Sequence, residues 1–155
     1  MGMERSVHEP TDDWIELTAT GLSTDAAMRH VTCPEAGGIA VFLGTTRAET
    51  SPEGHALAAL NYEAYPQMAI AQMRDLAARS RARWPIIKLA LLHRTGRVAV
   101  AEASVLIAVA CAHRGAAFEA SRWLIETLKA EVTVWKKEVW ADGSVSWVEG
   151  TPVVP

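Results

Sequence analysis

The side chains in this sequence that are best suited to chemistry are cationic and lie in its last third. Lys129 and Lys136 stand seven positions apart, Lys137 follows directly, and the pair His113-Arg114 precedes them. A lysine amine acts as a nucleophile or proton carrier only when its normal pKa, roughly 10.4, is lowered by loss of water or by neighbouring cations. A cluster of these side chains would lower that pKa and would also attract an anionic ligand.

Each of these residues also has an ordinary structural interpretation. Lys129 can form an ion pair with Glu126 within a helix, and Lys136 can pair with Glu149 across two strands. His113 can be a strand-end histidine that hydrogen-bonds to the backbone, or it can transfer protons or donate to a phosphate. Such structural pairs are more common than catalysis, so the residue types alone leave both interpretations open.

Most other catalytic equipment is missing from the sequence. The five histidines are scattered singly, with no His-x-x-x-His or Cys-x-x-Cys pair, which argues against a metal site. There is no Gly-x-Ser-x-Gly elbow and no glycine-rich phosphate loop. Cys33 and Cys111 do not indicate a disulfide framework, and a thiol in the apolar run that ends at Cys111 is usually a small buried hydrophobe. The sequence therefore predicts neither a metal site nor a bound cofactor.

A helix must carry Lys129. Apolar or small residues recur at three- and four-residue spacing, which predicts one buried stripe. The stripe consists of Ala117, Phe118, Ser121, Leu124, Ile125, Leu128 and Val132. Lys129 falls outside this stripe and close to the end of the helix, where its amine can reach a ligand.

A hairpin must carry Lys136. Residues 132–141 are rich in β-branched and aromatic side chains, and Asp142-Gly143 is a preferred sequence for a two-residue turn. With such a turn, Glu138 faces Trp147, and Lys136 faces Glu149. Because the strand follows directly after the helix, we expect the two lysines to converge beside His113 and Arg114.

The rest of the chain alternates between strands and helices. Strands are predicted over residues 14–19, 39–43, 57–65, 86–93, 98–100 and 104–111, and helices from Ser23 or Thr24 to about Val31 and from Pro66 to about Arg83. The 104–111 segment is apolar on both faces, which is typical of a central strand. These elements predict an α+β domain in which two main helices pack on a mostly antiparallel sheet that ends in the C-terminal hairpin.

Length, composition and charge limit the possible classes of protein. The 155 residues, 50% of them hydrophobic, suffice for a single core, and we expect a disordered leader over 1–12, one domain over 13–150 and a short tail over 151–155. A net charge of −3 argues against a general nucleic-acid binder. No apolar run approaches the ~20 residues of a membrane span, and the N-terminus lacks a signal-peptide core, so we expect a cytoplasmic protein.

Seven short motifs, in order and with matching spacing, resemble those of the large catalytic subunit of molybdopterin synthase. They are Phe42-Leu43-Gly44-Thr45-Thr46-Arg47, Tyr62-Glu63-Ala64-Tyr65, Arg83-Trp84-Pro85, His93-Arg94-Thr95-Gly96, Ala112-His113-Arg114, Ala117-Phe118-Glu119-Ala120, and Leu128-Lys129 with Trp135-Lys136-Lys137-Glu138. The match runs from Gly37 to Gly150. No single motif is specific, but seven of them in order within one small domain are hard to obtain otherwise.

The resemblance implies an α/β-hammerhead fold and a homodimer at the centre of a heterotetramer. Members of the family convert cyclic pyranopterin monophosphate into molybdopterin by adding two sulfur atoms, which form a dithiolene. The sulfur arrives as a thiocarboxylate on the C-terminal Gly-Gly tail of a small ubiquitin-like subunit that is inserted into the pocket of the large subunit. Two unremarkable cysteines are therefore enough for this chemistry.

The motif match also implies roles for individual residues. Lys129 and Lys136 take the places of the family's catalytic lysines. The substrate-binding places fall to Arg47, His113 and Arg114, with Lys137 as a helper that raises the local positive potential. Arginine suits a phosphate because its planar donors bind two oxygens at once.

The sequence departs from the family pattern at three places. Thr133 stands where the family usually has a proline, and Ala101 stands where a glycine commonly precedes Glu102. Both departures concern the backbone. The sequence also ends at Pro155, shortly after the hairpin, whereas many relatives have a longer tail that helps to hold the small subunit.

Two other functions fit parts of the sequence. A non-catalytic module could still dock a ubiquitin-like tail, although the joint presence of Lys129, Lys136 and Arg47 argues against it. The helix from Pro66 to Arg83 carries arginines outside its buried stripe, which would suit an RNA-binding domain. Such a domain would show a steep salt dependence of RNA affinity, and absence of binding at low salt would exclude it.

Overall fold

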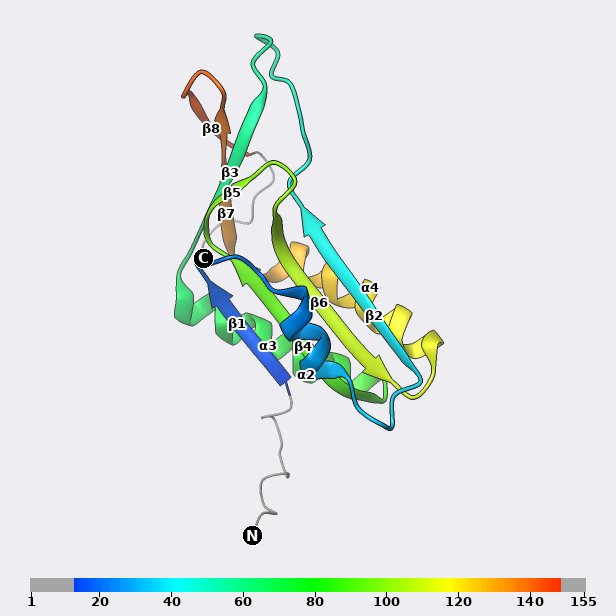
Figure 1. Ribbon diagram of the computed structural model, residues 1–155. Coiled ribbons are helices and arrows are strands. Elements are labelled where there is room, and N and C mark those ends of the chain that lie inside the picture. Colours follow the sequence, from blue (N-terminus) through cyan, green and yellow to red (C-terminus); the bar gives the residue numbers. More distant parts are fainter. Residues whose placement is uncertain (1–12, 149–155) are drawn as a thin grey trace.

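The computed structural model describes residues 13–148, which form two four-stranded sheets (Figure 1). The first, here called the core sheet, has the order β1-β4-β6-β2, with β1 at Asp13–Thr18, β4 at Ile86–Arg94, β6 at Ala103–Cys111 and β2 at Gly38–Thr45. The second, the pocket sheet, has the order β5-β3-β7-β8, with β5 at Gly96–Ala99, β3 at Leu57–Ala64, β7 at Val134–Trp140 and β8 at Val145–Trp147.

Among these described strands, β1 and β4 alone pair in parallel, and the other neighbours are antiparallel. The predicted α+β class with mostly antiparallel pairing is confirmed. The prediction had one sheet, whereas the structure has two. The predicted leader and tail lie outside the described residues.

The central strand is β6, as the sequence predicts. Residues 105, 107 and 109 of β6 belong to the apolar layer under α3 (Pro66–Arg83) and α4 (Arg114–Glu131). Residues 106, 108 and 110 belong to the layer under α2 (Thr24–Val31), which covers the other face. A strand that is covered on both faces buries every side chain, which explains the uninterrupted apolar run.

The helices begin and end where the local sequence predicts. The Ser23 hydroxyl accepts a hydrogen bond from the backbone N–H of Ala26 at 3.0 Å and so caps α2. Pro66 opens α3 at a position where no backbone N–H is needed, and the helix ends just before Trp84-Pro85. The positions of both predicted helix starts are confirmed.

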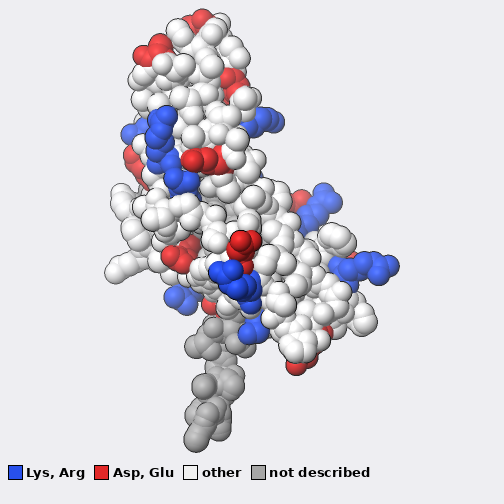
Figure 2. Space-filling model, viewed as in Figure 1, with Lys and Arg blue, Asp and Glu red and all other residues white. Residues whose placement is uncertain are grey.

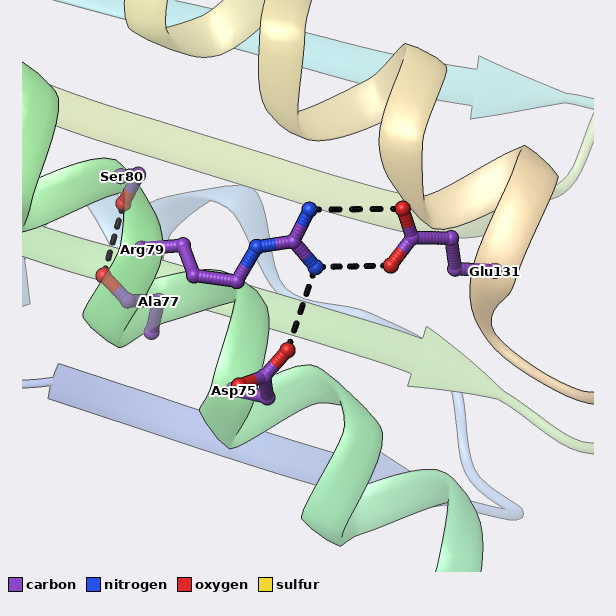
Figure 3. A network of polar contacts seen from close by, with 5 residues as sticks. All are labelled: Asp75, Ala77, Arg79, Ser80 and Glu131. Atoms are coloured by element: carbon purple, nitrogen blue, oxygen red, sulfur yellow. Dashed lines mark hydrogen bonds and ion pairs between the residues drawn. The ribbon is translucent and has the colours of Figure 1, made fainter.

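Arg79 ties α3 to the end of α4. Its guanidinium donates to both carboxylate oxygens of Glu131, at 2.7 and 3.3 Å, and to Asp75 at 3.1 Å (Figure 3). These contacts raise the pKa of Arg79 and lower the pKa of Glu131. Because the three side chains are well exposed, this network fixes the relative position of the helices more than it stabilises the fold.

The other arginines on α3 that the structure shows in contacts are also engaged by the protein itself. Arg81 donates to the carboxylate of Asp13 and to the carbonyl of Ile86, which anchors the helix on the core sheet. The guanidinium of Arg83 lies over the Trp84 ring, 4.6 Å from its centroid. The contacts of Arg81 and Arg83 weaken the case for an RNA-binding face on α3. On the opposite face, which α2 covers, basic and acidic side chains are interspersed (Figure 2).

The prediction for Phe118 is wrong. Its side chain is 66% exposed, whereas the other predicted members of the stripe are buried. The stripe is centred on Ala117, Leu124 and Leu128, and Phe118 points about 100° away from Ala117 around the helix. Phe118 therefore contributes an apolar surface and not a core contact.

The predicted register of the C-terminal hairpin is also wrong. The loop contains three residues, because the Trp140 N–H donates to the Ser144 carbonyl at 2.9 Å, and Gly143 is its one residue with a positive φ, 90°. As a result, Trp147 pairs with Lys137 rather than with Glu138. Glu149, the predicted partner of Lys136, lies outside the described residues.

Candidate active site

A pocket of about 460 Å³ opens where the pocket sheet meets the core sheet and the end of α4. Apolar side chains form part of its lining, with Phe42 from β2, Leu57 and Leu60 from β3, and Val105 from β6. Its charged residues are Arg47, Glu49, Lys129, Lys136 and Glu138. A concave, partly apolar site with a few convergent charges is the usual form of a small-molecule pocket.

The structure brings the two predicted lysines together in this pocket. Lys129 comes from the last turn of α4, and Lys136 comes from the middle of β7. Burial lowers the pKa of Lys136, and the charge of Lys129 lowers it further, against the opposing charges of Glu49 and Glu138. Lys136 therefore loses its proton more readily than an ordinary lysine.

The ordinary structural interpretation of Lys129 receives no support, and that of Lys136 involves Glu149, which lies outside the described residues. Glu126, the proposed partner of Lys129, is instead 3.0 Å from Arg122. Within residues 13–148, neither Lys129 nor Lys136 forms an ion pair. Among the described residues, no carboxylate thus holds either amine away from a ligand.

Arg47 stands at the mouth of the pocket. Its side chain is 85% exposed and forms an ion pair with Glu49 at 3.2 Å. An exposed pair of this kind is weak, so an anion that enters the pocket can displace Glu49 from the guanidinium. Arg47 can therefore turn toward a phosphate without a large energetic cost.

A strained turn supports the segment that carries Arg47. Ala101 is the one non-glycine residue with a positive φ, 76°, among the described residues. Its N–H donates to the carbonyl of Thr46 at 2.8 Å, and the N–H of Thr46 donates to the carbonyl of Glu102 at 3.0 Å. The glycine of the family pattern is thus replaced at a position where a left-handed backbone is required.

Two residues that line the pocket, Tyr62 and Ser104, were not identified from the sequence. Tyr62 and Ser104 line the pocket, and the ring of Tyr62 lies edge-on against His93, 5.2 Å away between centroids. Burial raises the pKa of Tyr62, partly offset by a hydrogen bond with Ser104. The alternation of β3 placed Tyr62 and Leu60 on one face, but nothing in the sequence showed that β7 pairs with this strand.

His113 and Arg114 do not meet the lysines within one chain. His113 is the N-cap of α4 and Arg114 its first residue, whereas Lys129 lies in its last turn. At 1.5 Å per residue, Arg114 and Lys129 are separated by about 22 Å along the helix axis. The predicted convergence of all four residues is therefore wrong for a single chain.

Lys137 is also outside the pocket. It lies on the opposite face of β7 from Lys136, forms an ion pair with Glu63 at 3.2 Å, and places its amine 4.9 Å from the centre of the Trp147 ring. These two contacts engage its charge on the other side of the pocket sheet. Its predicted role as a helper in the pocket has no geometric support.

Other kinds of chemistry find little material in the described part of the chain. Residues 13–148 contain no cluster of three or more histidine, cysteine or acidic side chains that could hold a metal ion. Cys111 is buried, which raises the pKa of its thiol. None of the helices in this region is long and apolar enough to cross a membrane. The polar side-chain groups that line the pocket are amines, a guanidinium, carboxylates and hydroxyls.

Comparison with known proteins points to one family. The family model described as MoaE protein matches residues 17–131. The chain is 43% identical to the molybdopterin synthase catalytic subunit of Bos taurus, over 91% of this chain and 74% of that protein. Its fold is similar to the crystal structure of molybdopterin synthase from Staphylococcus aureus, with a TM-score of 0.80 and 30% identity over 86% of this chain and 96% of the other.

A third similarity concerns the fold alone. In the protein–protein complex of subunits 1 and 2 of the molybdopterin-converting factor from Helicobacter pylori, one chain matches with a TM-score of 0.74 at 17% identity, over 90% of this chain and 94% of the other. The family match spans well over half of the chain, and the sequence identities agree with it. On these grounds the chain belongs to the MoaE protein family.

Proposed function

We propose that this protein is the catalytic subunit of a molybdopterin synthase and acts as a sulfurtransferase in the cytoplasm. It takes sulfur from the C-terminal thiocarboxylate of a small ubiquitin-like subunit and adds it to cyclic pyranopterin monophosphate, which yields the dithiolene of molybdopterin. The observation that carries the proposal is the placement of Lys129 and Lys136, free of ion pairs within residues 13–148, in one pocket with Arg47.

In this proposal the two lysines have different roles. Lys129 is exposed at the end of α4, so its amine can meet the carbonyl of the incoming thiocarboxylate. Lys136 is half-buried and has a lowered pKa, so its amine can accept and return a proton during the addition. Arg47, at the mouth of the pocket, binds the phosphate of the pterin through two donors at once.

The proposal includes a homodimer at the centre of a heterotetramer. His113 and Arg114 lie at the far end of α4 from Lys129, so they can serve a pocket of this kind only if they reach the pocket of a second copy. The exposed ring of Phe118, one turn after Arg114, is available for such a contact between copies. Light scattering of the chain alone is expected to give about twice 16.8 kDa.

Reconstitution tests the proposed reaction directly. The purified chain is mixed with a small subunit that carries the C-terminal thiocarboxylate and with cyclic pyranopterin monophosphate, and molybdopterin is assayed. The same small subunit with an ordinary carboxylate is the matched control and is expected to give no product. Tight binding of the small subunit without any product would instead identify a non-catalytic docking module.

A further inference from the structure

One buried histidine beside the pocket has no role in the proposed reaction. His93 is the second-to-last residue of β4 and is 5% exposed. It lies in the core sheet, between its partners Leu17 on β1 and Val105 on β6. Its ring contacts Tyr62 of the pocket sheet edge-on, with an interplanar angle of 70°. His93 thus joins the two sheets at the place where the pocket forms.

The hydrogen bonding of His93 fixes its tautomer. Nδ1 lies 2.8 Å from the carbonyl oxygen of Arg94. Because a carbonyl oxygen only accepts, Nδ1 must carry the proton and donate it. In the neutral ring Nε2 then holds a lone pair. The ring is thereby held in one orientation and presents a constant surface to Tyr62.

The surroundings keep this ring uncharged. Burial, together with the charges of Lys129 on α4 and Lys136 on β7, lowers the pKa of His93 to about 4. The titratable groups around this part of the pocket are Tyr62, Lys129, Lys136, Glu138 and Glu49. A charged imidazole here would repel the two amines, so the neutral ring is the form compatible with the pocket.

Tyr62 lies between His93 and Lys136. Tyr62 and Lys136 are direct partners across β3 and β7, and both side chains line the pocket. Tyr62 is 9% exposed, so its ring fills space that water would otherwise occupy beside Lys136. Loss of water is the main cause of the lowered pKa of Lys136.

We infer that His93 is a positioning residue for this pocket: its uncharged ring holds the Tyr62 ring between the two sheets, and Tyr62 keeps water away from the amine of Lys136. Only the importance of His93 for the reaction rests on the proposed function, and the positioning of Tyr62 does not. Its test needs neither substrate nor small subunit. A failure of this inference can therefore be told apart from a failure of the proposed function.

The test measures the protonation of Lys136 by competitive labelling with trace acetic anhydride at a series of pH values, followed by peptide mass spectrometry. In His93→Ala we expect the labelling midpoint of Lys136 to rise toward the ordinary lysine pKa of 10.5. Labelling at a fixed pH below the midpoint then falls, about tenfold for each unit of rise. Lys88, on β4, is the internal control in the same spectra and is expected to be unchanged.

Further variants separate the ring of His93 from its hydrogen bond. His93→Phe keeps a ring and is expected to keep the wild-type midpoint of Lys136. Tyr62→Ala should give the same rise as His93→Ala, and the double variant should give no more than either alone, because both act through one contact. His55, which is only partly buried, provides the matched control, since His55→Ala should leave the midpoint in place.

Three results would overturn the inference. They are an unmoved midpoint in a folded His93→Ala, a midpoint in His93→Phe that rises as far as in His93→Ala, and additive shifts in the double variant. If circular dichroism shows that His93→Ala does not fold, His93→Gln replaces it, because glutamine keeps an N–H donor for Arg94 but has no ring. We expect His93→Gln to show the same rise, and an unmoved midpoint there would also count against the inference.

Discussion

Tyr62 on β3 faces Lys136 on β7 as its direct partner, and both side chains enter the same pocket. The neighbouring pair, Leu60 and Glu138, lies on the same face. Because side chains alternate along a strand, a shift of β7 by one residue would carry Lys136 to the opposite face, where Lys137 now lies. The position of the Lys136 amine thus depends on the pairing of two strands that are far apart in the sequence.

The two lysines should respond differently to substitution. We expect Lys129→Ala to abolish both turnover and any covalent adduct with the small subunit, because in the proposed reaction this exposed amine meets the thiocarboxylate. Lys136→Ala should lower turnover by about 10²-fold to 10⁴-fold, the usual contribution of a positioned proton carrier, and leave docking intact. Product assays and binding measurements on folded, dimeric variants check both statements. Lys88→Ala, on β4 away from the pocket, is the matched control. Near wild-type turnover by Lys129→Ala would contradict the assignment.

A mixing experiment tests whether the pocket is shared between two copies. Arg114 and Lys129 lie at opposite ends of α4, so a shared site would take one of them from each copy. Lys129→Ala and Arg114→Ala should each be inactive alone, because every site then lacks one of these two side chains. After subunit exchange, half of the dimers contain one of each variant, and one of their two sites carries no substitution. Turnover should therefore return to about one quarter of the wild-type value. Two variants that stay inactive after verified exchange would place Arg114 outside the site of its partner.

The buried imidazole of His93 should make the fold less stable in mild acid. Burial lowers the pKa of His93 from 6.5 to about 4. Between these values the unfolded chain binds a proton that the native chain excludes, so the free energy of unfolding falls as the pH falls. The loss should be on the order of 3 kcal/mol by pH 4, with no further loss from this group below that pH.

Urea titrations at successive pH values measure this loss. His93→Gln cannot titrate and should lack the part of the slope between pH 6.5 and pH 4 that His93 causes. A slope in His93→Gln as steep as in the wild type would show that other groups are responsible.

Replacing Ala101 by glycine should stabilise the protein. Ala101 has a φ of 76°, which costs a residue with a side chain about 1 kcal/mol or more, while glycine adopts it freely. Glycine also increases the entropy of the unfolded chain, so the net gain should be no more than about 1 kcal/mol. A urea midpoint that rises with an unchanged m value checks the prediction. Ala99→Gly, in the adjacent strand β5, is the control and should destabilise.

Much of the fold could be predicted because burial leaves a pattern in the sequence. The central strand was identified from the two apolar faces of residues 104–111, and the helix starts from Ser23 and Pro66. The hairpin register could not be predicted, because Asp142-Gly143 fits a two-residue turn as well as the three-residue loop that forms. Local sequence likewise gave no sign that the strands divide into two sheets.

For the candidate site, local order along the chain was informative and distant pairing was not. Lys129 and Lys136 were expected to converge because a strand follows the helix directly, and they do. The expected place of His113 ignored the length of α4, which separates its two ends. His93 was passed over because its neighbour Tyr62 comes from another sheet. Contacts of that kind depend on tertiary pairing, which no periodicity in the sequence records.

The late position of β7 in the chain has a consequence for the order of assembly. More than half of the chain separates Leu57 from its partner Trp140, whereas the core sheet needs no strand beyond Cys111. Because a chain can fold as it is synthesised, the core sheet can pair before β7 has been made, so we expect the core sheet of a growing chain to be protected before β7 in pulse-labelling hydrogen exchange, and simultaneous protection would contradict this. A growing chain would then possess a folded core while its amines are still unarranged. The protein would become reactive only at the last step of its own folding.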